Sequence, residues 1–303
     1  MPSRSTEDSR AQVGAVVTAF GPGESLVLAV RSLVSQVSRV VVVDDGTPQA
    51  HAGSDEVYEE CRRIGATVVR HESNRGIGAA LNTGLDALRA GPTDVDHVLT
   101  LDQDSVLPEG YVASLVAAGR AATAQGVQVG MVAPGRASGI RSGAGKSAGG
   151  VVLGKEPIQS GLLVPTEVLR RIGGFDEPLF IDGVDSEFFL RARAHGYLCV
   201  VAPEVHLEHR LGRAAEVRIG PRVLTLVVAA DFRYYYQVRN VVELVRRYAR
   251  TEPVWSVGAV GKLLRHLTIT TTLVPGRRER LRYARRGLRD GLRRVQGPIP
   301  PTV

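Results

Sequence analysis

Apolar runs and amphipathic stripes alternate along the first two hundred residues of the chain. Val13–Val17 is apolar apart from one glycine and leads into a turn rich in glycine and proline, a pattern typical of a buried strand. From Leu26 to Val37 the apolar positions recur at helical spacing, which predicts a helix that packs one face on a sheet. Similar strands and helices follow one another to residue 202. This alternation predicts an α/β fold with a mostly parallel sheet flanked by helices on both faces.

The predicted elements follow a regular order. Strands are predicted at Val13–Val17, Val40–Val43, Ala66–Val69, His97–Leu101, Val127–Ala133, Gly161–Pro165 and Tyr197–Ala202. Helices are predicted at Leu26–Val37, around Val57–Ile64, at Ile77–Leu88, at Tyr111–Ala118, from Thr166 to Gly173 and at Asp185–His195. Thr166 is expected to be the N-cap of its helix. The sheet is therefore expected to be complete before residue 212.

Three segments depart from the alternating pattern. Residues 1–12 are short, polar and charged, and are predicted to be disordered. Residues 135–150 contain six glycines together with serines, and are predicted to form a mobile loop. After Gly212 the pattern changes to long helices. We therefore predict an α/β domain at residues 13–212 and a helical C-terminal extension at residues 213–303.

Composition limits the cellular setting. The chain has 303 residues and is 44% hydrophobic, enough for one large core. Cys61 and Cys199 lie outside any metal-ligand or redox spacing, which favours a reducing cytoplasm. The N-terminus lacks the apolar centre of a secretory signal, and the apolar stretch Val254–Val274 is interrupted by Lys262 and Arg265. These features predict a cytoplasmic protein without a spanning helix.

Positive charge is concentrated in the tail. Residues 251–303 hold eleven Lys and Arg against three acids, +8, so the total of +7 leaves −1 for residues 1–250. Nucleic acid is not favoured as a partner, because the tail lacks the interleaved aromatic residues of a base-stacking surface. A stripe in the arginine-rich segment 277–295 contains Leu281, Ala284, Leu288, Leu292 and Val295. Such a basic amphipathic helix suits the anionic inner face of the plasma membrane; a solvated helix and a contact between copies in a homo-oligomer are the alternatives.

Polar residues follow three successive strands. Asp44-Asp45-Gly46 follows the second strand, Asn74-Arg75-Gly76 the third, and Asp102-Gln103-Asp104 the fourth. In an open α/β sheet, ligands bind beyond the carboxyl ends of the strands. Asp102 and Asp104 flank one residue, so both carboxylates can reach one side of a loop and hold a divalent cation. Short acidic pairs are usually solvated turns, but the position directly after an apolar strand favours a cation site, which could bind a diphosphate.

A second acidic cluster begins the helix near residue 185. The helix dipole favours the charged form of Asp185 at this position, so it is predicted to be ionised and able to act as a base. The alternative is structural, with Asp185 as the N-cap and Glu187 supporting the first turn.

Two glycine motifs are not supported as nucleotide sites. Gly76-Ile77-Gly78 opens a helix, but Leu81 stands where a dinucleotide fingerprint needs its third glycine. Gly145-Lys146-Ser147 resembles a P-loop, but Ile140 stands where its first glycine is required. Neither a dinucleotide cofactor nor ATP hydrolysis is therefore predicted.

Taken in order, these motifs resemble family 2 glycosyltransferases of the GT-A fold, over about Gln12–Gly212. The motifs are Asp44-Asp45-Gly46, Asn74-Arg75-Gly76, Leu101-Asp102-Gln103-Asp104-Ser105, Ser160-Gly161, Gly173-Gly174-Phe175-Asp176-Glu177, and Phe180-Ile181-Asp182 with Asp185. The glutamine between the two aspartates and the Phe-Ile-Asp sequence are most similar to rhamnosyltransferases of that family. The resemblance implies a GT-A fold with a Rossmann-like nucleotide-binding half.

The resemblance also implies roles for individual residues. The residues expected to bind the donor nucleotide are Thr18, Ala19, Phe20, Asp44, Asp45, Asn74, Arg75, Gly76, Asp102 and Gln103. Asp104 would be the main ligand of Mg²⁺ or Mn²⁺, with Asp102 and His209 near the metal. Asp185 would be the catalytic base. The acceptor and sugar pocket would include Gly161, Asp182 and Glu187. Many relatives have an asparagine soon after the first strand, and this chain does not.

The implied activity is inverting, metal-dependent transfer of a sugar, L-rhamnose from dTDP-rhamnose, to a polysaccharide or lipid-linked glycan. The alternatives are a family 2 transferase with a UDP-sugar donor (hexose, galactofuranose or N-acetylhexosamine), a sugar-phosphate nucleotidyltransferase, and a non-catalytic nucleotide-sugar-binding protein. Phe232–Asn240 resembles the segment that follows the catalytic domain in these transferases. It either borders the donor diphosphate or acceptor, or packs one helix on the domain.

Overall fold

The computed structural model describes residues 12–51, 53–137, 140–141, 143–146, 149–207, 213–219 and 222–301. The chain divides into two compact units. Unit 1 comprises Met1–Asn74, Ala80–Gly174 and Arg191–His209, and unit 2 comprises Arg75–Ala79, Phe175–Leu190 and Arg210–Val303. The predicted disordered N-terminus lies outside the described residues except for Gln12. The predicted domain boundary at residue 212 stays a prediction.

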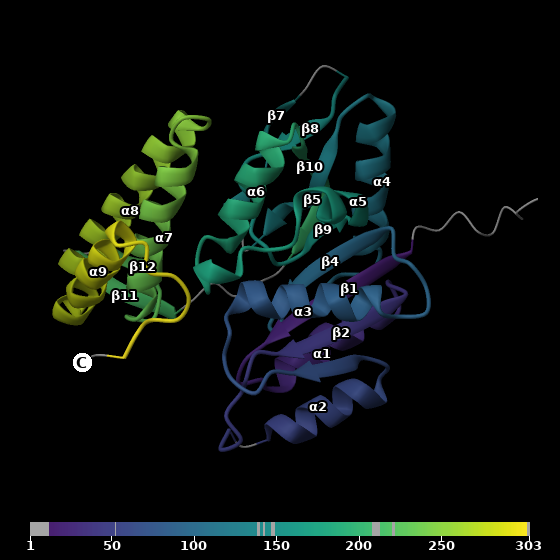
Figure 1. Ribbon diagram of the computed structural model, residues 1–303, viewed down its shortest axis with the longest axis horizontal. Coiled ribbons are helices and arrows are strands. Elements are labelled where there is room, and N and C mark those ends of the chain that lie inside the picture. The colour runs from purple at the N-terminus through teal and green to yellow at the C-terminus, as the bar shows by residue number, and fades with distance from the viewer. Residues whose placement is uncertain are drawn as a thin grey trace, which may run out of the picture. The chain divides into compact units, whose positions relative to one another are not determined.

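Unit 1 is built on a sheet whose described strands have the order β3-β2-β1-β4-β9-β5-β10-β8-β7, with β6 paired to β5 (Figure 1). The strands are β1 Val13–Ala19, β2 Arg39–Asp44, β3 Thr67–Arg70, β4 His97–Asp102, β5 Val129–Ala137, β6 Ile140–Arg141, β7 Gly143–Lys146, β8 Val152–Gly154, β9 Leu162–Pro165 and β10 Leu198–Leu207. β3, β2, β1, β4, β5 and β10 run in one direction, because β9 is antiparallel to both β4 and β5. The predicted mostly parallel sheet is confirmed.

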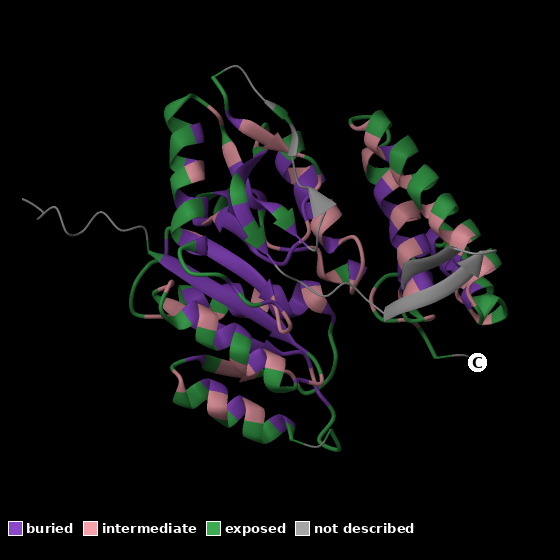
Figure 2. Ribbon diagram, turned by 180° about the vertical axis from the view of Figure 1, so that it is seen from behind, coloured by how far each residue is buried: buried purple, intermediate pink, exposed green. Residues whose placement is uncertain are grey.

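Helices cover both faces of this sheet. They are α1 Glu24–Val34, α2 Ser54–Arg63, α3 Ile77–Arg89, α4 Tyr111–Ala124 and α5 Thr166–Ile172; α6 Val184–Ala194 belongs mainly to unit 2. On one face, buried side chains of α1, α2 and α4 share a core with alternate residues of β1. β1 is buried along its whole length, as Figure 2 shows for the central strands. Burial on both faces explains why these strands are continuous apolar runs in the sequence.

The opposite face of β1 is covered by α3 at close range. A Cβ on Gly84 of α3 would lie 2.3 Å from Val16, and one on Gly14 would lie 2.7 Å from Leu88. Two glycines therefore let this helix lie directly on the strand that leads to Thr18 and Phe20. Their role is close packing, because no left-handed backbone is recorded at either position.

Three predicted details of secondary structure are wrong. β5 continues to Ala137 and is followed by β6 and β7, where one loop was expected, because these glycine-rich segments pair with neighbouring strands. Thr166 is the first residue of α5 and not its cap; its hydroxyl donates to Val95 O at 2.7 Å. The segment after Gly212 begins with the antiparallel strands β11 Arg213–Ile219 and β12 Arg222–Val228. β-Branched residues on both sides of Gly220-Pro221 are the hairpin signal that was missed.

The helices of unit 2 are α7 Arg233–Tyr248, α8 Pro253–Leu273 and α9 Arg277–Leu292. α9 packs on α7 through small residues: a Cβ on Gly287 would lie 2.3 Å from Tyr235 O, and one on Gly291 would lie 3.1 Å from Arg239 O. Ala284 is buried, whereas the leucines of the predicted stripe are exposed. Within the part of the chain that the structure describes, no helix combines the length and apolar character needed to span a bilayer.

Candidate active site

In unit 1, the end of β4 is tied to β1 and to the turn before β9. Thr18 pairs in register with Asp102, and its hydroxyl donates to Asp102 Oδ1 at 3.5 Å. The N–H of Asp102 donates to Ser160 Oγ at 3.1 Å, and the Ser160 and Ser105 hydroxyls lie 2.8 Å apart. Since Ser105 and Ser160 are fully buried, they fix the backbone on which Asp102 stands.

Gln103 joins the turns that follow β1 and β4. Its Oε1 accepts from the N–H of Phe20 at 2.9 Å, and its Nε2 donates to Phe20 O at 3.2 Å. Both ends of one amide therefore bond to one backbone residue, 83 positions away in the chain. This contact turns Gln103 toward β1 and gives a structural reason for a glutamine between Asp102 and Asp104. Its predicted contact with the donor nucleotide stays a prediction.

Asp44 fixes the turn after β2. It is fully buried, its Oδ1 accepts from the N–H and the hydroxyl of Thr47 at 2.9 and 2.5 Å, and its Oδ2 accepts from Arg70 Nε at 2.9 Å. The Tyr58 hydroxyl lies 3.3 Å from Thr47 Oγ1, and burial raises the pKa of Tyr58, so this hydroxyl stays protonated. Asp44 is thus a buried anchor for the turn that carries Asp45. The predicted nucleoside contact of Asp44 is untested.

Asp45 is part of a chain of polar groups that the sequence did not reveal. Asp45 Oδ1 lies 3.0 Å from His71 Nδ1, and His71 Nε2 lies 2.9 Å from the Thr83 hydroxyl. The two hydrogen bonds fix which way the His71 ring faces and hold the Asp45 carboxylate at the end of β2. His71 directly follows β3, so the rule that singled out polar residues at strand ends could have identified it.

Gly46 brings the turns after β2 and β3 into contact. It has φ 75°, and a Cβ there would lie 2.2 Å from Ser73 C and 2.4 Å from Asn74 N. A larger residue would therefore meet backbone that cannot move as a side chain can. The turns after β2 and β3 therefore lie side by side in unit 1. They carry the predicted nucleotide-binding residues Asp45 and Asn74.

The local structure also requires a glycine at position 161. It has φ 77°, and a Cβ there would lie 2.4 Å from the Tyr111 hydroxyl, which donates to Gly161 O at 2.8 Å. Its N–H donates to Thr100 O at 2.8 Å. Gly161 thereby holds its turn against β4; a contact with acceptor or sugar stays a prediction.

Five further candidates lie in unit 2: Arg75, Gly76, Asp182, Asp185 and Glu187. Gly76 has φ 92°, and a Cβ there would lie 2.5 Å from Phe180 O; the N–H of Ile77 donates to the same oxygen at 2.8 Å. Arg75 forms an ion pair with Glu177 at 3.5 Å. The start of α3 therefore lies against the loop that leads to α6.

Asp185 lies in the first turn of α6 and is partly exposed. The helix begins at Val184, so Asp185 is a helical residue and the alternative that makes it the N-cap is not supported. Its Oδ1 accepts from the N–H of Ser186 at 2.9 Å. Glu187 is buried and accepts from the Tyr248 hydroxyl at 2.9 Å, which gives it a structural contact with α7. Of the two acids, Asp185 is the one with access to solvent.

The donor atoms on the β4 turn fit a hard divalent cation. Asp102 and Asp104 are half-buried carboxylates one residue apart, and Gln103 turns away to Phe20. Within the described ranges, no group of three or more His, Cys, Asp and Glu side chains could hold a metal by itself. Two carboxylates suit Mg²⁺ or Mn²⁺ when substrate phosphates and water complete the shell. His209 lies outside the described residues.

Comparison with known proteins agrees with this arrangement. Residues 15–157 match the family model described as Glycosyl transferase family 2. The dTDP-rhamnosyl transferase RfbF of Shigella flexneri is 29% identical over 143 residues, which are 46% of this chain and 46% of that protein. The match thus spans about half the length of this curated relative.

Solved structures share the fold at low sequence identity. S. aureus TarS 1–349 in complex with UDP-GlcNAc has a TM-score of 0.56 and 16% identity, over 94% of this chain and 81% of that one. GalNAc-T7 with UDP, GalNAc and Mn²⁺ has a TM-score of 0.54 and 15% identity, over 67% of this chain and 44% of that one.

The sheet topology and these likenesses show that the chain shares the fold of GT-A glycosyltransferases. Residues 15–157 are similar to Glycosyl transferase family 2, and a dTDP-rhamnosyl transferase is among the similar proteins. The predicted fold is confirmed, and these similarities support the predicted family and enzyme class.

Proposed function

We propose that this enzyme transfers L-rhamnose from dTDP-rhamnose to a polysaccharide or lipid-linked glycan, with inversion at the anomeric carbon. The observation that carries the proposal is the Asp102-Gln103-Asp104 turn, in which Gln103 bonds to Phe20 and two half-buried carboxylates lie one residue apart at the end of β4. The similarity to a dTDP-rhamnosyl transferase supports the choice of donor.

The proposed mechanism is a single in-line displacement. Asp104 and Asp102 would hold Mg²⁺ or Mn²⁺, and such a cation would stabilise negative charge on a departing diphosphate. Asp185, in the first turn of α6, accepts the proton of the attacking acceptor hydroxyl. Attack from the side opposite the leaving group inverts the configuration. The turns held by Asp44, Asp45 and Gly46 bind and orient the nucleoside.

A donor panel tests the proposal. We expect dTDP-rhamnose to be turned over faster than UDP-hexose, UDP-galactofuranose and UDP-N-acetylhexosamine, measured as nucleoside diphosphate release with membrane-extracted lipid-linked glycans. Faster turnover of a UDP-sugar would favour the alternative donor class. This class is tested because the chain shares its fold with TarS, which was solved in complex with UDP-GlcNAc. Pyrophosphate release from a nucleoside triphosphate would indicate a nucleotidyltransferase. Donor binding without turnover would indicate a binding protein.

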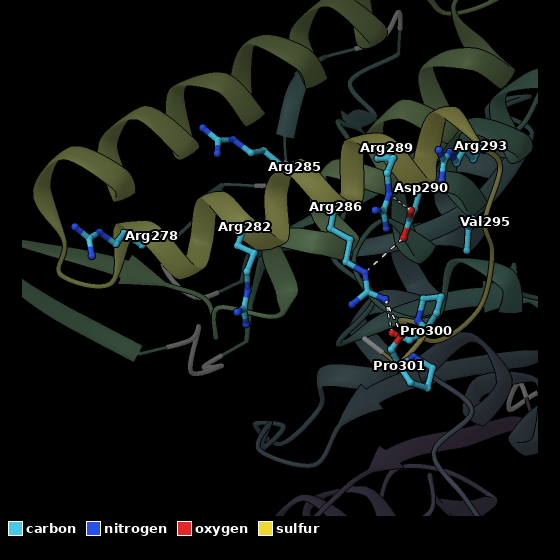
Figure 3. A pocket seen from close by; sticks show the side chains of 10 residues that line it. All are labelled: Arg278, Arg282, Arg285, Arg286, Arg289, Asp290, Arg293, Val295, Pro300 and Pro301. Atoms are coloured by element: carbon cyan, nitrogen blue, oxygen red, sulfur yellow. Dashed lines mark hydrogen bonds and ion pairs between the residues drawn. The ribbon is translucent and has the colours of Figure 1, made fainter. Parts of the chain in front are cut away.

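The proposal includes peripheral contact with the inner face of the plasma membrane. On α9, Leu281, Leu288 and Leu292 are 37%, 47% and 70% exposed. Beside this stripe, six arginines line a pocket of about 720 Å³ together with Asp290, Val295, Pro300 and Pro301 (Figure 3): Arg278, Arg282, Arg285, Arg286, Arg289 and Arg293. Exposed leucines next to arginines suit an anionic membrane surface, where a lipid-linked acceptor would lie.

The arginine surface gives a testable expectation. Arg278, Arg285 and Arg293 have no ion-pair partner among the described residues, so replacing all three with Gln removes charge without breaking a salt bridge. We expect this variant to bind vesicles with anionic phospholipid at least about 10-fold more weakly, because each basic residue near the surface contributes about 1 kcal/mol. Arg136, Lys155 and Arg171, exposed residues of unit 1 without an ion pair among the described residues, are replaced with Gln as the matched control, and binding is measured by co-sedimentation. Equal binding by both variants would exclude this surface.

A further inference from the structure

The loop between Asp176 and α6 has a strained backbone. Phe180 has φ 66° and Asp182 has φ 62°, and Arg294 is the other non-glycine residue with positive φ in the described chain. Left-handed conformations are unfavourable for side chains with a Cβ and persist when surrounding contacts enforce them. The loop ends at Gly183, and Asp185 is the second residue of α6. The contacts that hold the loop therefore also position the proposed base.

Asn240 of α7 holds the loop through its side-chain amide. Its Nδ2 lies 3.0 Å from Leu179 O, 2.8 Å from Ile181 O and 2.5 Å from Asp182 O. These three carbonyls surround the two strained residues. Asn240 is 2% exposed, so water cannot replace the amide as a donor.

Arg239, also 2% exposed, supports the same loop. Its Nη2 donates to Leu179 O at 2.7 Å, its Nη1 donates to Gly297 O at 2.5 Å, and its Nε donates to Asn240 Oδ1 at 2.8 Å. The last bond turns the Asn240 Nδ2 toward the loop. Within the part of the chain that the structure describes, no carboxylate pairs with Arg239, and backbone carbonyls and the Asn240 amide oxygen accept its hydrogen bonds. A buried guanidinium used in this way fixes backbone geometry.

Ring contacts and an ion pair complete the arrangement. The Phe180 ring stacks on Tyr236 with 5.1 Å between centroids, and the Arg239 guanidinium lies over the Tyr236 ring, 5.0 Å from its centroid. Arg233 donates to both carboxylate oxygens of Asp182 at 3.0 and 2.6 Å. Side chains of α7 therefore contact both residues with positive φ, Phe180 and Asp182.

We propose that Asn240, oriented by Arg239, is a positioning residue for sugar transfer: it holds the Leu179–Asp182 backbone so that Asp185 presents its carboxylate at the start of α6. This inference rests on the proposed function, in which Asp185 is the base. The Phe232–Asn240 segment was expected either to border the donor diphosphate or acceptor, or to pack one helix on the domain. Positioning of the loop before α6 is a third role. Asn240 acts through the loop and touches no reacting atom.

The test compares Asn240→Asp and Asn240→Ala with Val238→Ala, a buried aliphatic change on the same helix. Asn240→Asp keeps the shape of the side chain and removes its N–H donors. We expect both Asn240 variants to lower kcat for dTDP release from dTDP-rhamnose, with lipid-linked glycans present, by about 100-fold, the scale associated with a misplaced catalytic group. Donor KM and the affinity for dTDP with Mn²⁺ are expected to change less than about twofold.

A fold check and a second variant separate the outcomes. Thermal unfolding establishes that each variant is folded, and rates are compared per folded enzyme. A folded Asn240→Asp enzyme with the parent kcat, or a Val238→Ala enzyme that loses as much kcat, would overturn the positioning role. If Asp185→Asn keeps the parent rate, the assignment of the base fails whatever the Asn240 variants do. If Asp185→Asn is inactive and folded Asn240 variants are not impaired, this inference alone fails.

Discussion

Asp185→Asn is expected to lower the transfer rate by about 10³-fold, within the range that general base catalysis contributes. Asparagine has nearly the same shape and accepts the Ser186 N–H that Asp185 accepts at 2.9 Å, but it cannot take a proton from the acceptor. The start of α6 should therefore be unchanged. The measurement is kcat for dTDP release with acceptor, together with the affinity for dTDP in the presence of Mn²⁺.

The control for this variant is Glu167→Gln, the same chemical change on the exposed face of α5. We expect it to have the parent rate. The affinity of Asp185→Asn for dTDP should stay within about twofold, because the base acts on the acceptor and not on the nucleotide. Transfer by Asp185→Asn at the parent rate would remove Asp185 from the mechanism.

Asp104→Asn is expected to abolish metal-dependent turnover, with a loss of more than about 100-fold. Removing a residue that hydrogen-bonds to a metal ligand costs about 10–100-fold in metal affinity or activity. The Asp104→Asn change is more severe, because it removes the charge of the proposed ligand itself. The turn should keep its shape, because Gln103 bonds to Phe20 and Asp102 to Ser160 through contacts that do not involve the Asp104 carboxylate. The measurement is donor turnover as a function of Mn²⁺ concentration.

Asp94→Asn provides the comparison, since Asp94 is exposed and precedes β4 in the chain. A chelator should remove activity from the parent enzyme and from Asp94→Asn alike, and added Mn²⁺ should restore both. A parent enzyme that retains full turnover in chelator, or an Asp104→Asn enzyme with the parent response to Mn²⁺, would contradict the role of Asp104.

Much of the fold was predictable from local pattern. β1, β2 and β4 are buried strands of the sheet, and this environment requires the unbroken apolar runs that the sequence contains. The positions of Asp44, Asp45, Asp102 and Asp104 followed from the rule that parallel strands end at the same edge. The short strands β6 and β7 and the β11–β12 hairpin were missed, because their pairing depends on neighbours more than on composition.

Several contacts at the site were not predictable, because they join residues far apart in the chain. The bond of Gln103 to Phe20, 83 residues away, was not predicted, and the expected nucleotide contact of Gln103 stays a prediction. His71 was missed although it follows β3, and its bond to Asp45 depends on β2 and β3 being neighbours. The bond of Tyr248 to the buried Glu187 was not predicted either, and the expected place of Glu187 in the sugar pocket stays a prediction.

Local sequence patterns were enough to predict the order of the long strands and helices up to residue 202, the acids at the strand ends and the start of α6 near Asp185, because periodicity and turn residues are properties of neighbouring positions. The tertiary structure alone decided which polar groups are buried and which partners they meet: Asp44 with Arg70, Gln103 with Phe20, and Asn240 with the strained loop. The physical reason is that a buried polar group must find a hydrogen-bond partner in space, and chain separation places no limit on where that partner lies.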